Sequence, residues 1–98
     1  MSVLDRQVIE ARVAELSGWS LDPAGRLVRR FSFPDFAAAL SFANLIGAES
    51  EAFGHHPDLL VSWGKLEVTL WTHDAGGLTD QDFAMVNRID RAAQGLRG

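Results

Sequence analysis

Residues 59–73 read LLVSWGKLEVTLWTH and are rich in residues that favour β-strands. Apolar and polar side chains alternate in part over residues 66–73, which is typical of a strand with one buried face. Gly64-Lys65 interrupts the run and offers a turn. We therefore expect a β-hairpin whose first strand spans residues 59–63 and whose second strand spans residues 66–73.

An earlier hairpin is expected on the N-terminal side of this one. Residues 19–21 and 27–33 are two short runs that favour strands, and the turn-forming sequence Asp-Pro-Ala-Gly at residues 22–25 separates them. This hairpin also carries three arginines, which we place on a solvent-exposed face: Arg26, Arg29 and Arg30.

Three further segments, residues 3–16, 34–53 and 79–96, have apolar residues at helical spacing. In the first segment we expect a helix with one buried apolar stripe, and Gly18 as its C-cap. The second helix is expected to end at Gly54, shortly before a proline.

The second and third helices are each preceded by a hydroxyl and a carboxylate three residues apart, the spacing of a capping box. These pairs are Ser32 with Asp35 and Thr79 with Asp82. The predicted order of elements is α-β-β-α-β-β-α. Two hairpins separated by helices favour a single α+β domain over residues 1–98, with a four-stranded antiparallel sheet and helices packed on one face.

The composition limits the classes of function. The chain has 98 residues, a formal net charge of −4 and no cysteine. A disulfide, a thiolate zinc site and a cysteine nucleophile are therefore excluded, and the acidic balance argues against a nucleic-acid partner. The sequence contains no run of ~18 consecutive apolar residues and no secretory signal at its start. We expect a cytoplasmic protein without a membrane partner.

Three histidines stand at the ends of predicted elements: His55, His56 and His73. Glu51 precedes His55 by four residues, a spacing that places both side chains on one face of a helix. Pro57 favours extended backbone at His56, so the two neighbouring imidazoles are expected to point in different directions.

These residue types fit two kinds of chemistry. Imidazole has an unperturbed pKa of ~6.5 and is suited to proton transfer near neutral pH. Histidine and carboxylate are also metal ligands, so the three histidines and Glu51 could form a metal site. Adjacent histidines followed by a proline rarely converge on one ion, which favours the acid–base interpretation.

The spacing of seven residues resembles the motif of the pterin-4a-carbinolamine dehydratases, a family also known as the dimerisation cofactor of a homeodomain transcription factor. That motif has an acid, three residues, His-His-Pro, and then an aromatic residue, a histidine and an aspartate at set intervals. The matching residues are Glu51, His55, His56, Pro57, Trp63, His73 and Asp82. The resemblance covers nearly the whole chain and is closest to bacterial members, although Gly54 and Leu59 replace residues that are polar or aromatic in other members.

The resemblance implies a hydro-lyase, 4a-hydroxytetrahydrobiopterin dehydratase. Such enzymes remove water from the 4a-hydroxytetrahydropterins left by aromatic amino acid hydroxylases, recycle a tetrahydrobiopterin-type cofactor, and need neither a metal nor a redox cofactor. His55 and His73 would act as acid and base, in either order, with His56 positioning the substrate or sharing the work. The resemblance also implies substrate-binding roles for Glu51, Trp63 and Thr72, and structural roles for Pro57 and Asp82.

A pterin-binding or protein-binding module without catalytic activity is the alternative, because some members of the family bind a transcription factor through a helical surface. Apolar stripes at residues 4–16 and 83–96 could serve such a partner or a second copy of the chain. Self-pairing into a homodimer or homotetramer is the simpler expectation for a chain with bacterial-type motifs.

Overall fold

The computed structural model describes residues 2–97. Its elements, in chain order, are α1 (Arg6–Ala14), β1 (Ser20–Leu21), β2 (Leu27–Ser32), α2 (Phe36–Phe53), β3 (Asp58–Ser62), β4 (Lys65–Leu70) and α3 (Asp80–Arg97). The predicted order of helices and strands is confirmed.

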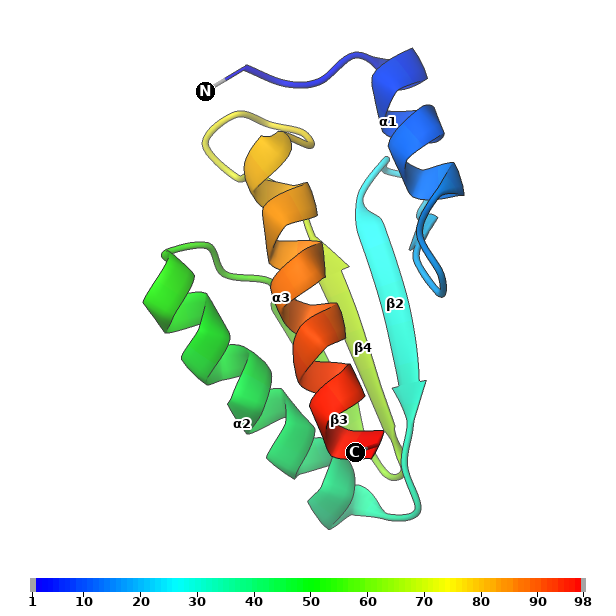
Figure 1. Ribbon diagram of the computed structural model, residues 1–98, viewed down its shortest axis with the longest axis vertical. Coiled ribbons are helices and arrows are strands. Elements are labelled where there is room, and N and C mark those ends of the chain that lie inside the picture. The colour runs from blue at the N-terminus through cyan, green and yellow to red at the C-terminus, as the bar shows by residue number, and fades with distance from the viewer. Residues whose placement is uncertain (1, 98) are drawn as a thin grey trace.

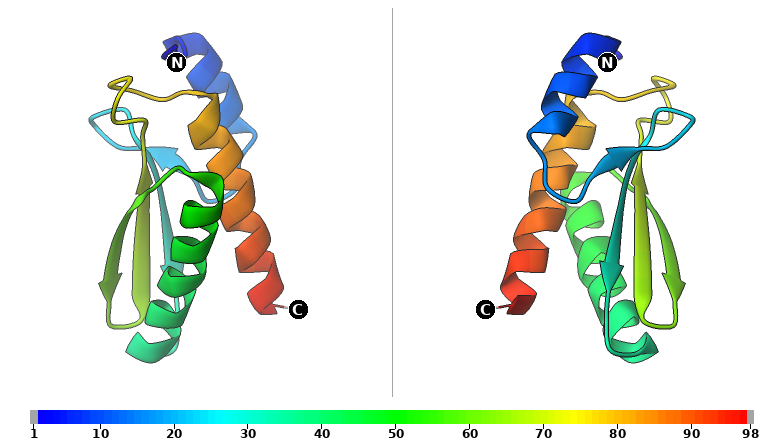
Figure 2. Two further views of the ribbon diagram at one scale, coloured as in Figure 1. Left: turned by 90° about the vertical axis from the view of Figure 1, so that its left-hand side faces the viewer. Right: turned by 90° about the vertical axis from the view of Figure 1, so that its right-hand side faces the viewer.

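The strands form one antiparallel sheet in the order β1-β2-β4-β3. Helices α2 and α3 run in opposite directions across one face of this sheet, and α1 lies on the same side near the start of α3 (Figures 1 and 2). The predicted α+β architecture, with helices on one face, is therefore confirmed. Within residues 2–97, no helix combines the length and apolar composition needed to cross a bilayer.

The core lies between the sheet and the two long helices. β4 is a central strand whose alternate residues Leu66, Val68 and Leu70 are fully buried. They pack against buried side chains of α2 and α3, among which Phe42 and Ile89 have no exposed surface. Burial of this kind contributes roughly 1.5–3 kcal/mol for each large aliphatic or aromatic side chain.

The second hairpin is shorter than predicted. β4 ends at Leu70 and not at His73, because neither neighbouring strand continues beside it. β2 begins at Leu27, directly opposite Leu70, and Pro57 precedes β3 and has no N–H to donate. The chain therefore leaves the sheet after Leu70, and this departure opens space for the site described below.

The turn of this hairpin is also displaced by one residue from the prediction. β3 ends at Ser62 and β4 begins at Lys65, which leaves Trp63 and Gly64 in the turn. Gly64 has a φ of 71°, a left-handed conformation that glycine adopts without the strain a Cβ atom would cause.

Of the three caps predicted for α1 and α2, two are wrong and one is confirmed. α1 ends at Ala14, with Glu15 as its C-cap, and Gly18 lies beyond it in the turn before β1. Asp35, not Ser32, is the N-cap of α2: its carboxylate accepts a hydrogen bond from the backbone N–H of Ala38. Ser32 is paired in the sheet as the last residue of β2 and is not available as a cap. Gly54 ends α2 as predicted.

The placement of Arg29 on an exposed face was also wrong. Arg29 alternates with the buried Leu27 and Phe31 and so faces the helices, where its guanidinium donates to Asp90 of α3 at 2.6 Å. Trp19 donates to the same carboxylate at 2.9 Å. Asp90 accepts from both the buried Trp19 and the partly buried Arg29, and this explains why a charged residue is tolerated on the inner face of β2.

The apolar stripes expected to be free for a partner are largely occupied. The α3 stripe packs into the core, with only Leu96 strongly exposed at its end. In α1 no residue is fully buried, although Ile9 and Val13 are half-buried against the core. The prediction of a buried stripe in α1 is therefore only partly correct, and neither helix offers a continuous apolar face.

Candidate functional site

The strand register brings the histidines together. Asp58 at the start of β3 lies opposite Thr69 near the end of β4. Residues just before Asp58 must therefore lie beside residues just after Thr69, since the two strands are antiparallel. In this way the hairpin places His56 near His73, although they are separated by sixteen intervening residues.

A cavity of about 210 Å³ opens at this end of the sheet. The segment after α2, the segment after β4 and the first turn of α3 all contribute to its lining. The lining residues are Gly54, His55, His56, Trp71, Thr72, His73, Asp74 and Gln81. All three histidines predicted to be catalytic thus line one cavity.

His55 is buried and held by Asp82 of α3. Its Nε2 lies 2.6 Å from Oδ1 of Asp82, and that aspartate has no exposed surface. A carboxylate oxygen accepts the bond, so Nε2 carries the hydrogen. In the neutral ring the lone pair is then on Nδ1, the nitrogen that can accept a proton.

Asp82 is itself fixed by two further donors on its other oxygen. Oδ2 accepts from the Thr72 hydroxyl at 2.7 Å and from the backbone N–H of Thr79 at 2.9 Å. The Thr79 hydroxyl lies 2.8 Å from that of Thr72 and accepts from the backbone N–H of Gln81. Because Thr72 gives its hydrogen to Asp82, Thr79 must donate to Thr72, and the network is complete.

The predicted capping box of α3 is confirmed by these contacts, since Thr79 and Asp82 each bond to backbone near the helix start. Asp82 therefore does more than its predicted structural role, because it also orients a histidine of the cavity. This second role could not be predicted from local sequence, because the capping motif alone accounts for Asp82 and its partner His55 is 27 residues away in the chain.

Glu51 pairs with His56 and not with His55, contrary to the prediction from helical spacing. The helix ends at Gly54, whose φ of 80° turns the chain out of the helical path. His55 is thereby directed inward to Asp82, while His56 remains at the surface beside the last turn of α2. The expectation that the two rings point in different directions is consistent with this arrangement.

His73 forms the opposite side of the cavity with Trp71. The two rings stack with centroids 4.2 Å apart and planes inclined by 21°. The guanidinium of Arg26 lies 4.0 Å from the centroid of the Trp71 ring. Trp71 is not among the residues predicted for the site; its position two residues before His73, just beyond the strand, is the signal that could have identified it.

Of three other predicted site residues, Thr72 lines the cavity, whereas Pro57 and Trp63 do not. Thr72 lines it, but its hydroxyl already donates to Asp82 and accepts from Thr79. Pro57 is half-buried at the start of β3. Trp63 is 74% exposed in the turn at the other end of β3 and β4, so the predicted role in binding substrate is not supported within one chain. Among residues 2–97, no group of three His, Asp or Glu side chains is arranged to hold a metal ion.

Comparisons with known proteins agree on one family. The family model described as pterin 4 alpha carbinolamine dehydratase matches residues 2–92. A protein of Rickettsia bellii, provisionally named pterin-4-alpha-carbinolamine dehydratase, is 41% identical over 88 residues, covering 89% of this chain and 78% of its own. A protein of Rhizobium johnstonii with the same provisional name is 39% identical over 94 residues, covering 95% of this chain and 93% of its own.

Solved structures of other proteins also have a fold similar to that of this chain. A crystal structure from Brucella melitensis, described as a transcriptional coactivator/pterin dehydratase, superposes with a TM-score of 0.86 at 28% identity, covering 94% of this chain and 99% of that one. A pterin dehydratase-like protein described as a RuBisCO assembly factor of the alpha-carboxysome has a TM-score of 0.65 at 24% identity, covering 79% and 90%. The second similarity concerns the fold alone.

Proposed function

Since this chain belongs to the pterin 4 alpha carbinolamine dehydratase family, we propose that it dehydrates 4a-hydroxytetrahydropterins to quinonoid dihydropterins. The observation that carries the proposal is the cavity lined by three histidines, one of them oriented by a buried carboxylate. Sites in which proton-transfer groups are held in this way are typical of general acid–base catalysis.

The reaction needs two proton transfers and no change of oxidation state. The bond between C4a and its hydroxyl oxygen breaks, and an acid supplies the proton with which the hydroxyl leaves as water. The electron pair of the N5–H bond forms the new C4a–N5 double bond, and a base takes that proton. The acid and base end the cycle with exchanged protonation states, which a proton exchange with water restores.

His55 and His73 are suited to these two transfers. Asp82 holds the His55 ring in one orientation and stabilises the positive charge that appears when this ring takes up a proton. His73 is an exposed ring on the other wall of the cavity, supported by the stack on Trp71. His56, held by Glu51 at the surface, is placed to position the substrate.

The shape and lining of the cavity also support a flat heterocycle as substrate. About 210 Å³ is smaller than the ~300–1,000 Å³ of pockets for drug-sized ligands and suits one bicyclic ring. Trp71 and His73, stacked on one another, give the cavity an aromatic wall against which a flat ring can pack. We further propose supply of the substrate by an aromatic amino acid hydroxylase and a cytoplasmic location.

The proposal is tested by following the ultraviolet absorbance of freshly generated 4a-hydroxytetrahydropterin with and without the purified protein. We expect acceleration over the uncatalysed rate, and a loss of about 10²–10⁴-fold in His55→Ala and in His73→Ala. Circular dichroism of each variant checks that it is folded. A folded wild-type protein that does not accelerate the reaction would rule out this function.

A protein-binding role is the second candidate. The observation that favours it is the exposed side of α2, where Phe36 and Leu40, four residues apart, each expose more than 40% of their surface. No charged residue interrupts this face between residues 36 and 48. We propose that a second copy of the chain covers it in a homodimer or homotetramer.

A further inference from the structure

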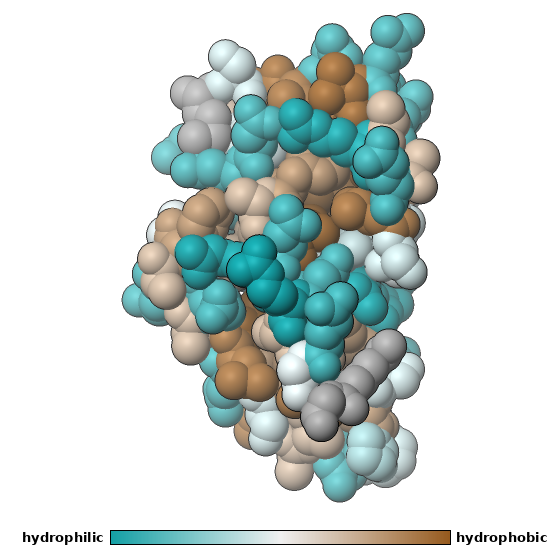
Figure 3. All heavy atoms as spheres, in the orientation of Figure 1, coloured by the Kyte–Doolittle hydropathy of each residue, from teal (hydrophilic) through white to brown (hydrophobic). Residues whose placement is uncertain are grey.

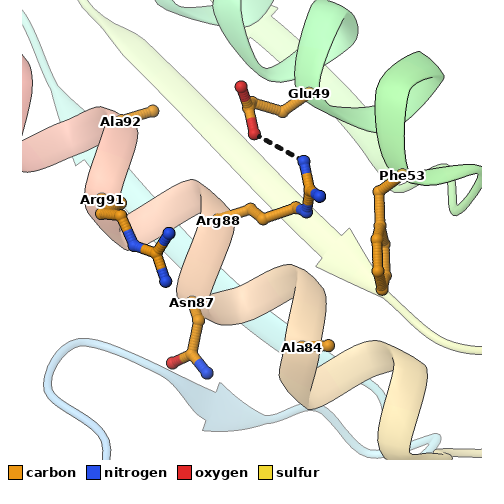
Figure 4. A pocket seen from close by; sticks show the side chains of 7 residues that line it. All are labelled: Glu49, Phe53, Ala84, Asn87, Arg88, Arg91 and Ala92. Atoms are coloured by element: carbon orange, nitrogen blue, oxygen red, sulfur yellow. Dashed lines mark hydrogen bonds and ion pairs between the residues drawn. The ribbon is translucent and has the colours of Figure 1, made fainter.

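A second cavity, of about 470 Å³, lies between α2 and α3 (Figure 4). It differs from the histidine cavity in its chemistry, because arginines line it. Arg88 and Arg91 of α3 form one side, and Glu49 and Phe53 of α2 form the other. The proposed dehydration uses none of these residues, so the cavity requires a separate explanation.

The two cavities lie along a single face of α3. Gln81 lines the histidine cavity, while Ala84, Arg88 and Arg91 line the second one. These positions are separated by three, four and three residues, the spacing of neighbours on one helix face. On the α2 side, Phe53 of one cavity adjoins Gly54 of the other. The two cavities are therefore neighbours at the end of α2, and we call the pair of them the α2–α3 groove.

The far part of the groove is positively charged in an acidic protein. Arg88 donates to Glu49 at 3.1 Å, and its guanidinium lies 4.7 Å from the centroid of the Phe53 ring. Figure 4 shows Arg88 reaching across to these two residues, while Arg91, three residues further along α3, extends toward Asn87. The lining carries two positive charges and one negative charge, whereas the whole chain has a net charge of −4. Hydrophilic side chains also gather over the middle of α3 in the space-filling view (Figure 3).

Building on the proposed dehydratase function, we propose that the groove selects tetrahydropterins whose C6 side chain ends in a phosphate, with Arg88 and Arg91 binding the phosphate. Guanidinium groups form paired hydrogen bonds with phosphate oxygens, and two of them match a doubly charged group. Arg91 is exposed, so its side chain can turn toward Arg88 when a phosphate binds. Glu49 holds Arg88 in place and leaves other N–H groups of its guanidinium free to donate.

The distances along α3 agree with such a substrate. Arg88 is seven residues and Arg91 ten residues beyond Gln81, which at 1.5 Å per residue is roughly 10 and 15 Å along the helix. A phosphate on a three-carbon chain lies roughly 6 Å beyond C6 by ordinary bond lengths, and arginine side chains span the remaining distance. The ring can therefore lie at the histidines while the phosphate is at the arginines.

The test measures the binding of unreactive pterins and the turnover of reactive ones in separate experiments. Calorimetry measures the dissociation constants of two fully oxidised pterins, which have no 4a-hydroxyl and do not react. One has a three-carbon C6 side chain with a terminal phosphate, and the other is its dephosphorylated form. We expect the phosphorylated pterin to bind roughly tenfold more tightly, as one charge-assisted contact provides. The corresponding pair of 4a-hydroxytetrahydropterins is then compared by KM.

Variants assign the effect to the groove. Arg88→Gln and Arg91→Gln are each expected to weaken binding of the phosphorylated pterin roughly three- to tenfold and to leave the dephosphorylated one unchanged. Arg91 is exposed and has no role in the core, so Arg91→Gln remains informative if Arg88→Gln impairs folding. Arg6→Gln, an exposed arginine of α1 outside the groove, is the control and should change neither value.

The outcomes separate this inference from the proposed function. Equal affinity for the two pterins, or an unchanged preference in Arg91→Gln, would overturn the inference even if both substrates are dehydrated. Inorganic phosphate that binds as tightly as the phosphorylated pterin would also overturn it, because the site would then be an anion site unrelated to the substrate. A phosphate preference lost in Arg91→Gln supports the inference even in a protein without turnover, in which case the proposed function alone fails.

Discussion

Asp82 contributes both to the stability of the fold and to the orientation of His55 in the candidate site. The carboxylate has no exposed surface and accepts hydrogen bonds from the His55 ring, the Thr72 hydroxyl and the Thr79 backbone N–H. All three partners are donors, so a group at this position must be an acceptor on both oxygens. Aspartate meets this condition, and the nearly isosteric asparagine does not.

We predict that Asp82→Asn lowers the dehydration rate by about 10–100-fold, because the His55 ring loses the partner that orients it. We also expect the free energy of unfolding to fall by roughly 1–3 kcal/mol, since an amide N–H₂ would face buried donors. Steady-state kinetics and urea denaturation measure the two effects.

Asp80→Asn is the matched control for this prediction. Asp80 lies two residues earlier in the same helical turn, but it is exposed and pairs with Arg12 at the surface. A surface pair of this kind contributes about 0–1 kcal/mol, so both the rate and the stability should change little. An Asp82→Asn variant as active as Asp80→Asn would contradict the positioning role of Asp82.

At the scale of secondary structure, the end of α2 directs the two adjacent histidines. Gly54 has a φ of 80°, and its N–H closes the helix onto the carbonyl of Ser50. This left-handed residue sends His55 toward α3 and leaves His56 beside Glu51. No atom lies within 4 Å of the place a Cβ would take at Gly54, so the requirement for glycine comes from the backbone alone.

We predict that Gly54→Ala destabilises the protein by about 1–2 kcal/mol, the cost of a left-handed conformation for a residue with a Cβ atom. Gly47→Ala is the matched control, because Gly47 lies within α2 and a Cβ there would also meet nothing within 4 Å. That change should stabilise the protein by roughly 0.5–1 kcal/mol through helix propensity. Urea denaturation of the two variants should give shifts of opposite sign, and equal shifts would contradict this account of the cap.

At the scale of the whole molecule, the outer face of α2 is a surface suited to self-association. α2 covers the sheet with its inner face, where Phe42 and Ile46 are fully buried, and exposes Phe36 and Leu40 on the other. The stripes predicted for self-pairing, in α1 and α3, are used for packing within the chain. An exposed uncharged helix face is covered most simply by a second copy, since a small domain gains stability by burying more surface.

We predict that the wild-type protein is a dimer or tetramer by light scattering and that Leu40→Lys shifts it to a monomer, because the lysine places a charge in the proposed interface. Leu96→Lys is the control: Leu96 is similarly exposed, at 50% against 43% for Leu40, but lies at the end of α3. A monomeric wild-type protein, or equal masses for the two variants, would contradict an interface on α2.

Much of the architecture could be predicted from the sequence because it depends on local patterns. Helical periodicity, the alternation in residues 66–70 and the turn at Gly54 each act over a few residues, and they led to the correct order of elements. The histidine cluster was found in the same way, from residue types at set intervals that resemble a family motif. The errors at Ser32 and Gly18 concern the ends of elements, where competing local partners decide the boundary.

Which side chains pair with one another in the candidate site depends on contacts between segments that are far apart in the sequence. Glu51 and His55 have the spacing of helix neighbours, yet His55 binds Asp82 because α3 packs beside the end of α2. Trp71 lines the cavity and Trp63 does not, because Trp71 follows the end of β4 that lies beside the start of β3, whereas Trp63 lies in the turn at the opposite end of the hairpin. Local sequence patterns therefore predicted which elements form, whereas only helix packing and strand register decided which side chains meet, since both depend on the docking of segments far apart in the chain.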